Sequence, residues 1–237
     1  MDPTSYTERR SKIEDYFDRT AVQAWARLTS DAPVGRIRAT VRAGRDRMRA
    51  TLLGWLPADM TGMRLLDAGC GTGALAVEAA RRGAQVLAID LSPTLIDLAR
   101  DRQPAELTTE HSAGRIDFRA GDMLDPALGE FDYVVGMDSL IHYQTPDAVQ
   151  VVAGLAKRTR RGLLFTYAPS NPALIAMRAV GRLFPRKDRA PWIEPVAEAT
   201  LHRLLGADPA LQDWQRGRTE RIASGFYTSQ ALELLRK

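Results

Sequence analysis

The sequence contains very little cysteine and no long hydrophobic run. Its single cysteine, Cys70, excludes a disulfide bond within these 237 residues. No apolar stretch approaches the roughly 20 residues that a membrane-spanning helix requires, and the charged start, MDPTSYTERRSKIEDYF, lacks the apolar core of a secretory signal. We therefore expect a cytoplasmic protein. Neither Cys70 nor the three histidines belong to a metal-ligand pattern, so no metal site is predicted.

The charge balance is modestly basic, with 33 Lys and Arg against 29 Asp and Glu. Arginines are concentrated between positions 36 and 49, and a second basic region extends from 157 to 189. Most of these side chains are expected to lie on a solvated surface. The same residues are compatible with attraction of an anionic substrate, membrane lipid or nucleic acid, and charge alone does not decide among them.

The spacing of hydrophobic residues divides the chain into an arm and a core. Through residues 1–56, apolar residues recur at helical spacing, which predicts an N-terminal helical arm. Through 57–168, short apolar runs alternate with helical segments, which predicts βαβ units and a parallel sheet. The expected strands are 63–68, 85–90, 115–120, 131–137 and 162–167, and the expected helices between them are 74–82, 93–102 and 146–158.

The remainder of the chain carries a lid and a closing segment. Five prolines fall between positions 169 and 195, and this stretch is too long for a simple connection, so we expect a partly helical lid over 169–200. Residues 201–237 are expected to close the fold with a helix and two strands, although the last segment fits a helix or a strand equally well. We expect residues 1–237 to form one α/β domain.

The strongest functional signal is a glycine-rich turn, DAGCGTG, between the first core strand and its helix. Gly69, Gly71 and Gly73 permit positive φ angles and let a ligand contact the backbone. Their spacing differs from the G-x-G-x-x-G of dinucleotide sites, and Asp67 ends the strand where a carboxylate would repel a pyrophosphate. A cationic ligand suits this turn better, which favours S-adenosylmethionine (SAM) over NAD.

Acidic residues follow the next two expected strands at corresponding points. Asp90 is expected to accept hydrogen bonds from ribose hydroxyls, and Asp122 from the exocyclic amine of adenine. Met123 is expected to lie against the adenine ring, and the backbone near Met137 to face the methionine moiety. Each aspartate alone is equally well explained as a helix cap or turn residue. Their shared register beside the glycine turn favours the cofactor.

Residues 63–167 resemble the class I SAM-dependent methyltransferases. The resemblance implies a Rossmann-like, seven-stranded, mostly parallel sheet with helices on both faces and an antiparallel final strand. The helical arm and the lid after the fifth strand are additions to that fold. Leu91 and Trp25 complete the predicted cofactor-binding residues, and S-adenosylhomocysteine (SAH) is the expected product of the cofactor.

Segments outside this core resemble the magnesium-protoporphyrin O-methyltransferases of bacteriochlorophyll and chlorophyll biosynthesis, and hence of photosynthesis. These segments are YFDRTAVQAWARL (16–28), R-x-x-V-x-x-G-R-D-x-M (38–48), GMDSLIHY (136–143), LFPRKDRAP (183–191) and GRTERIASGFYTSQALE (217–233). The resemblance implies methylation of one propionate of magnesium protoporphyrin IX, with Tyr16 and His142 as catalytic residues. It also implies contact with the porphyrin-binding subunit of magnesium chelatase and peripheral association with the inner face of the membrane.

The chemistry of such a substrate limits what the protein has to supply. A propionate resembles the Glu side chain, whose pKa is about 4.3, and is anionic at neutral pH without a general base. We therefore expect Tyr16 and His142 to position and polarise the attacking oxygen. A hydrophobic slot for the porphyrin, with arginines at its rim for the second propionate, is expected from the arm and the lid. Its predicted residues are Trp25, Ile37, Met48, Leu183, Phe184 and Trp192.

Three other functions remain open from the sequence. An O-methyltransferase of another hydrophobic acid or phenol, such as a quinone precursor, would keep the cofactor residues and differ in the arm and lid. A nucleic-acid methyltransferase is disfavoured, because MDSLIH stands where enzymes that methylate flipped adenine carry an Asn/Asp-Pro-Pro-aromatic segment, and no basic RNA-binding module is visible. A non-catalytic cofactor-binding subunit is disfavoured by the intact glycine turn and acidic positions.

Overall fold

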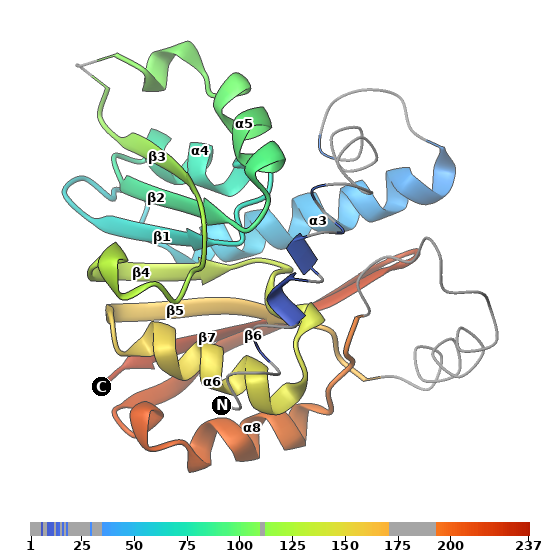
Figure 1. Cartoon of the computed structure of the whole chain (residues 1–237). Coiled ribbons are helices and arrows are strands. Elements are labelled where there is room, and N and C mark those ends of the chain that lie inside the picture. The colour runs from blue at the N-terminus through green and yellow to red at the C-terminus, as the bar shows by residue number, and fades with distance from the viewer. Residues whose placement is uncertain are drawn as a thin grey trace.

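A seven-stranded sheet lies at the centre of the part of the chain that the structure, a computed structural model, describes (Figure 1). The described residues are 6, 9–11, 13, 14, 16, 18, 29, 35–109, 112–170 and 193–237. The strands are β1 (Arg64–Ala68), β2 (Gln85–Asp90), β3 (Arg115–Ala120), β4 (Phe131–Gly136), β5 (Thr159–Tyr167), β6 (Trp214–Ser224) and β7 (Tyr227–Arg236). Each expected core strand is therefore present, with shifts of a few residues at its ends.

The strand order is β3-β2-β1-β4-β5-β7-β6. Strands β1 to β5 run parallel, whereas β7 pairs antiparallel with both β5 and β6. This confirms the expected mostly parallel sheet with an antiparallel final strand. The last segment of the chain, which fitted a helix or a strand, is a strand that lies inside the sheet.

Helices cover both faces of the sheet (Figure 1). They are α3 (Arg36–Trp55), α4 (Ala74–Arg81), α5 (Pro93–Asp101), α6 (Thr145–Ala156) and α8 (Glu198–Ala207), with short 3₁₀ turns at Ala105–Leu107, Pro126–Leu128, Leu140–His142 and Pro209–Leu211. Helix α5 begins where its sequence predicts, because the Ser92 hydroxyl accepts a hydrogen bond from Leu95 N and Pro93 occupies the first turn.

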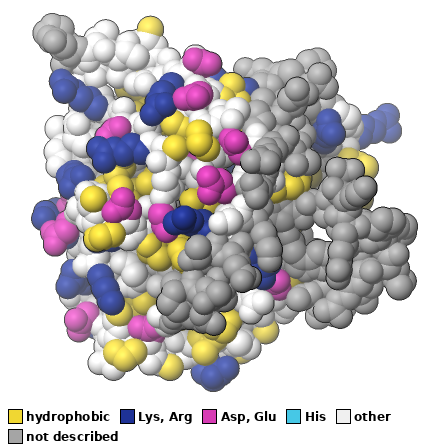
Figure 2. Space-filling model, in the orientation of Figure 1, with side chains coloured by type: hydrophobic (Ala, Val, Ile, Leu, Met, Phe, Trp, Pro, Cys, Tyr) yellow, Lys and Arg dark blue, Asp and Glu magenta, His cyan; other side chains and the backbone are white. Residues whose placement is uncertain are grey.

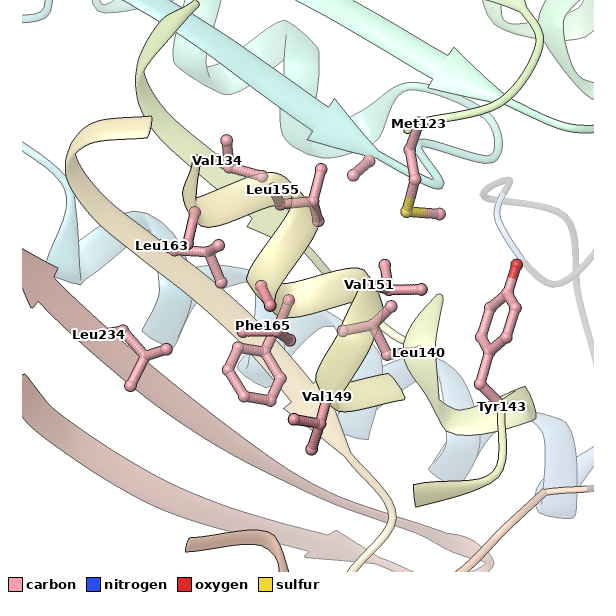
Figure 3. Close-up of a cluster of buried hydrophobic side chains, with 14 of the residues drawn as sticks. Met123, Val134, Leu140, Tyr143, Val149, Val151, Leu155, Leu163, Phe165 and Leu234 are labelled. Atoms are coloured by element: carbon pink, nitrogen blue, oxygen red, sulfur yellow. The ribbon is translucent and has the colours of Figure 1, made fainter. Parts of the chain in front are cut away.

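Two hydrophobic layers hold these helices against the sheet. Neighbouring strand residues alternate between the layers: Leu163 packs with the α6 and α8 side, and Leu164 with the α3, α4 and α5 side. Figure 3 shows Val151 and Leu155 of α6 in the first layer. This alternation explains why the core strands read as nearly continuous apolar runs, since both faces of each strand are buried.

Helix α3 confirms the second helix expected in the arm, and it packs against β6 and β7. Met48, which we predicted to line a porphyrin slot, is fully buried in the hydrophobic layer, so that prediction is wrong. Ile37, another predicted slot residue, is 60% exposed at the start of α3. Trp25 and the lid residues Leu183, Phe184 and Trp192 lie outside the described residues.

The expected lid is described only at its two ends, where Pro169 forms a parallel bridge with Val196. The division into 1–56, 57–168, 169–200 and 201–237 therefore stays a prediction. Basic and acidic side chains are interspersed over the described part of the face in Figure 2. Among the described helices, none has both the length and the hydrophobicity needed to cross a bilayer.

Two glycines of α3 provide a matched test of how closely this helix approaches β7. A Cβ on Gly44 would lie 2.5 Å from Cδ1 of Tyr227, whereas a Cβ on Gly54 would have nothing within 4 Å. Gly44→Ala is therefore expected to be less stable than Gly54→Ala by about 1–3 kcal/mol, because it overpacks this contact. Gly54→Ala itself should be neutral or gain up to about 1 kcal/mol.

Urea unfolding of both variants and of the unsubstituted protein measures this difference. Equal midpoints for the two alanine variants would contradict the observed packing of α3 on Tyr227.

Candidate active site

A cavity of about 260 Å³ lies at the carboxyl ends of the central strands, between the glycine turn and helix α3. Most of the predicted cofactor residues meet here. Those that line the cavity are Asp67, Gly69, Gly71, Asp90, Leu91, Met123 and Met137, together with the predicted catalytic residue His142. Gly73, Asp122 and Tyr16 do not line it, and Trp25 lies outside the described residues.

The glycine turn adopts the backbone conformation that its composition predicts. Gly69, Gly71 and Gly73 have φ angles of 83°, 55° and 77°, in the left-handed region that side chains with a Cβ disfavour. A Cβ on Gly69 would also collide with the side chain of Ser139, which follows β4. The turn can therefore lie close to the end of β4 only because glycine occupies this position.

Asp90 both supports the turn and faces the cavity. One carboxylate oxygen accepts a hydrogen bond from Gly71 N at 2.9 Å, and the other accepts one from Ser92 N at 3.0 Å. Asp90 therefore does stabilise the turns that follow β1 and β2, which was the structural alternative to cofactor binding. Because each carboxylate oxygen has a second lone pair, these bonds leave acceptor capacity at the cavity for the ribose hydroxyls that we predict.

Asp67 is the most deeply buried carboxylate of the site, at 1% exposure. Its Oδ2 has no hydrogen-bond partner among the described residues. Burial, followed by the nearby negative charge of Asp90, raises the pKa of Asp67 to about 7, against a smaller lowering effect of a hydrogen bond from Ala76 N. Two carboxylates in one cavity favour either a proton or a cationic ligand.

Asp122 lies at the edge of the site and binds the N-terminal segment. Its carboxylate accepts hydrogen bonds from Tyr6 Oη at 2.7 Å, Arg10 Nη1 at 2.9 Å and Leu124 N at 2.8 Å. The Tyr6 ring stacks on Tyr143, with 5.6 Å between ring centroids, and Tyr143 lines the cavity. The sequence analysis missed Tyr6 and Arg10, and the adenine contact of Asp122 stays a prediction.

The two predicted catalytic residues are placed differently. His142 is 8% exposed in the 3₁₀ turn after β4 and lines the cavity. Tyr16 is partly buried in the N-terminal segment, outside the cavity lining, and burial raises its pKa. Cys70, which lies in the glycine turn, is a thiol at neutral pH, because burial and then the charge of Asp67 raise its pKa well above the usual value.

Asp138, also missed by the sequence analysis, joins the end of β4 to three other elements. It is the non-glycine residue of the described chain with a positive φ, 54°. Its carboxylate accepts hydrogen bonds from Arg45 Nη1 at 2.6 Å, Ser229 Oγ at 3.0 Å, Thr166 Oγ1 at 3.1 Å and Tyr227 Oη at 3.2 Å. These contacts fix α3, β5 and β7 around the cavity.

Known proteins match both the core and the C-terminal half of the chain. The family described as "Methyltransferase domain" matches residues 65–162, and "Magnesium-protoporphyrin IX methyltransferase C-terminus" matches residues 136–236. The magnesium-protoporphyrin O-methyltransferase of Rhodobacter capsulatus is 51% identical over 232 residues, which are 98% of each chain. This chain belongs to the magnesium-protoporphyrin O-methyltransferase family. Membership confirms the resemblance stated from the sequence.

A solved member of this family has the same fold. The crystal structure of magnesium protoporphyrin IX methyltransferase from Synechocystis PCC 6803 with bound SAH matches with a TM-score of 0.81 and 27% identity. The match covers 96% of this chain and 100% of the relative. By contrast, a ubiquinone biosynthesis O-methyltransferase of Xanthomonas oryzae pv. oryzae is 37% identical over 138 residues, 54% of each chain.

The raised pKa of Asp67 predicts an unusual stability profile. Because the folded state holds the Asp67 proton up to a pH of about 7, while the unfolded carboxyl releases it near its ordinary pKa of about 3.9, Asp67 costs stability increasingly as the pH rises between these values. Asp67→Asn removes that cost. We expect the variant to gain up to a few kcal/mol over the unsubstituted protein between pH 5 and pH 8.

Unfolding in urea at several pH values measures this gain, and Asp101→Asn, at an exposed position of α5, is the control. A difference between Asp67→Asn and the unsubstituted protein that does not grow with pH would contradict the assigned burial cost.

The same Asp67→Asn variant should bind SAM more weakly at pH 8, since it lacks the negative charge that a cationic ligand requires.

Proposed function

We propose that this protein transfers a methyl group from SAM to a propionate carboxylate of magnesium protoporphyrin IX, yielding the monomethyl ester and SAH. The observation that carries the proposal is the extent of the family likeness, which reaches 98% of the chain at 51% identity. A likeness restricted to a shared cofactor core would leave the substrate open. Here it also includes residues 136–236, which contain His142 and the strands β5 to β7.

The cavity fits the cofactor through its charge. The buried Oδ2 of Asp67 lacks a partner among the described residues, and Asp90 lies in the same cavity. A ligand with sulfonium and ammonium groups supplies the positive charge that these carboxylates favour. Asp67 would hold the amino group, Asp90 the ribose, and Met123 the adenine ring. The Synechocystis relative, whose structures contain bound SAH or SAM, supports this assignment.

Bound SAM supplies an electrophilic methyl group, and the attacking propionate is already anionic at neutral pH. The protein therefore needs to align the carboxylate oxygen with the methyl carbon and to exclude water. Such alignment contributes several kcal/mol to catalysis. His142, at the cavity wall, is suited to orient and polarise the propionate oxygen, and we assign the same role to Tyr16 on family resemblance.

A second candidate is methylation of another hydrophobic acid or a phenol, such as a quinone precursor. The ubiquinone biosynthesis relatives favour it, because one of them is 37% identical to this chain over 138 residues. Their likeness leaves nearly half of the chain unmatched, whereas the porphyrin family spans almost all of it. We therefore rank the porphyrin first.

Contact with the porphyrin-binding subunit of magnesium chelatase, peripheral attachment to the inner face of the membrane and a cytoplasmic location also belong to this proposal. The resemblance to the family supports the first two. The exposed arginines at the start of α3, Arg36 and Arg38, suit an anionic membrane surface.

Incubation with methyl-labelled SAM and a panel of acceptors tests the proposed substrate. The panel contains magnesium protoporphyrin IX, metal-free protoporphyrin, hydroxylated quinone precursors and RNA. We expect label on magnesium protoporphyrin IX, and mass analysis should find a single methyl ester. Label on a quinone precursor alone would establish the second candidate, and SAM binding without transfer to any acceptor would contradict both.

Replacement of the two proposed catalytic residues separates chemistry from cofactor binding. We expect His142→Phe with Tyr16→Phe to lower kcat by about 10²-fold or more, because donors that polarise the reacting oxygen are lost. The dissociation constant for SAH should change much less. His202→Gln is the control, since His202 of α8 contacts Arg216 of β6 and does not line the cavity. Unchanged kcat in the double variant would contradict the assignment.

A further inference from the structure

Two exposed hydrophobic side chains lie at one end of the described structure. Ile37, at the start of α3, is 60% exposed, and Phe226, in the turn between β6 and β7, is 67% exposed. The start of α3 and this turn lie at the same end of the molecule (Figure 1). Single exposed hydrophobic residues are common on soluble proteins. These two, however, are among only three exposed large hydrophobic residues in the described part of the chain.

The packing of α3 on the hairpin of β6 and β7 explains why this end is uncovered. Gly44 packs on Tyr227, and one turn earlier a Cβ on Gly225 would collide with the Thr40 hydroxyl. Ile37 lies almost one further turn back, and its carbonyl oxygen accepts a hydrogen bond of 2.8 Å from Thr40 Oγ1. Because the hairpin turns at Gly225, the hydrophobic side of α3 continues past the end of the hairpin.

The two exposed arginines at this end are not neutralised. Residues 35–45 contain four arginines and no acidic residue, and residues 222–230 of the hairpin contain no charged side chain. Arg36 and Arg38, on either side of Ile37 in the sequence, are exposed and have no ion-pair partner among the described residues. Basic side chains project at the end of the molecule where α3 begins (Figure 2). Their positive charge is therefore available to an anionic partner.

The cofactor that we propose does not account for this surface. Neither Ile37 nor Phe226 lines the cavity, so a ligand in the cavity leaves both side chains uncovered. The cavity is nevertheless close, because Arg45, eight residues after Ile37 on the same helix, lines it and binds Asp138. Eight residues of α-helix span about 12 Å. A partner that holds the start of α3 would therefore lie near the cavity wall.

A lipid bilayer combines the two chemistries that this end of the molecule presents. Exposed hydrophobic side chains insert beside the acyl chains, and arginines bind the phosphates of anionic headgroups. Side chains at a helix start and at a hairpin turn project from the fold, which suits insertion between lipids, whereas a protein partner would need a matching hollow. We propose that Ile37 and Phe226 insert into an anionic bilayer, with Arg36 and Arg38 at the level of the headgroups.

This inference deepens the peripheral membrane attachment that belongs to the proposed function, and it rests on that attachment for its partner. It assigns the attachment to four side chains at one end of the molecule. It also places the cavity beside the bilayer, where an acceptor with a large hydrophobic ring would partition.

Sedimentation of the full chain with vesicles tests this surface. The vesicles are phosphatidylcholine alone and an equal mixture of phosphatidylcholine and phosphatidylglycerol. One variant removes the hydrophobic side chains, Ile37→Ser with Phe226→Ser, and another removes the charge, Arg36→Gln with Arg38→Gln. Circular dichroism and urea unfolding verify that each variant is folded.

Matched variants separate this surface from general effects of charge and hydrophobicity. Arg160→Gln with Arg203→Gln removes the same charge from exposed positions of β5 and α8. Ile37→Leu with Phe226→Leu keeps the hydrophobic side chains, and Arg36→Lys with Arg38→Lys keeps the charge. All three control variants should bind the mixed vesicles nearly as well as the unsubstituted protein.

We expect the unsubstituted protein to bind the mixed vesicles, more weakly as salt is added, and to bind phosphatidylcholine alone poorly. Loss of both arginines should lower the affinity about tenfold to thirtyfold, since each basic residue near an anionic surface contributes about fivefold. Loss of both hydrophobic side chains should lower it by roughly tenfold or more. Phe226→Ser alone should still methylate the porphyrin in detergent solution without vesicles.

Equal vesicle binding by the unsubstituted protein and by both loss variants would overturn the assignment. If these variants bind vesicles normally but lose affinity for the porphyrin-binding subunit of magnesium chelatase, the surface is a protein interface and the bilayer is excluded. If Phe226→Ser instead loses methyl transfer in detergent solution while vesicle binding is unchanged, the surface belongs to the porphyrin site.

Failure of this inference is distinguishable from failure of the proposed methyl transfer. An unsubstituted protein that methylates the porphyrin but binds neither kind of vesicle would overturn the membrane surface and leave the transfer intact. One that binds the mixed vesicles through these four residues but methylates no acceptor would establish the surface and contradict the transfer.

Discussion

The burial of Asp67 beside Asp90 is the constraint on which the rest of the site depends. Burial penalises the charged form of a carboxylate that lacks a compensating partner, and the raised pKa of Asp67 reflects that cost. The fold supplies backbone donors for Asp90, through Gly71 and Ser92, but leaves an oxygen of Asp67 uncompensated within the described residues. The cofactor that we propose for this cavity carries sulfonium and ammonium groups, whose positive charge would compensate the buried carboxylates.

Two further aspartates, each just after a strand, attach N-terminal elements to the sheet. Asp122, after β3, binds Tyr6 and Arg10, and Asp138, after β4, binds Arg45. Aspartates at the strand ends therefore have two roles: Asp67 and Asp90 face the cavity, Asp122 holds the N-terminal segment, and Asp138 both lines the cavity and holds α3. The aspartates that follow these strands therefore have to be interpreted together.

Local sequence patterns predicted the sheet and the glycine turn, whereas contacts between residues far apart in the sequence could not be predicted. The strands, the glycine turn, Asp67 and Asp90 were predictable because hydrophobic period and strand-end register depend on neighbouring residues. Tyr6 and Asp138 were not, because their partners are 116 and 93 residues away. Met48 was misassigned for a different reason: an apolar helical stripe looks the same whether it packs on a sheet or on a ligand.

The position of β7 between β5 and β6 also constrains the order in which the sheet can assemble. Residues 227–236 insert between β5 and β6, so β6 has no strand to pair with until they have been synthesised. Before β7 is inserted, the edge of β5 is exposed. This strand carries Leu163 and Phe165, which are buried in the folded protein. An exposed hydrophobic strand edge favours association with other chains. Because Tyr227 and Ser229 also contribute hydrogen bonds to Asp138, the contacts at the cavity wall are complete only once β7 has been inserted into the sheet.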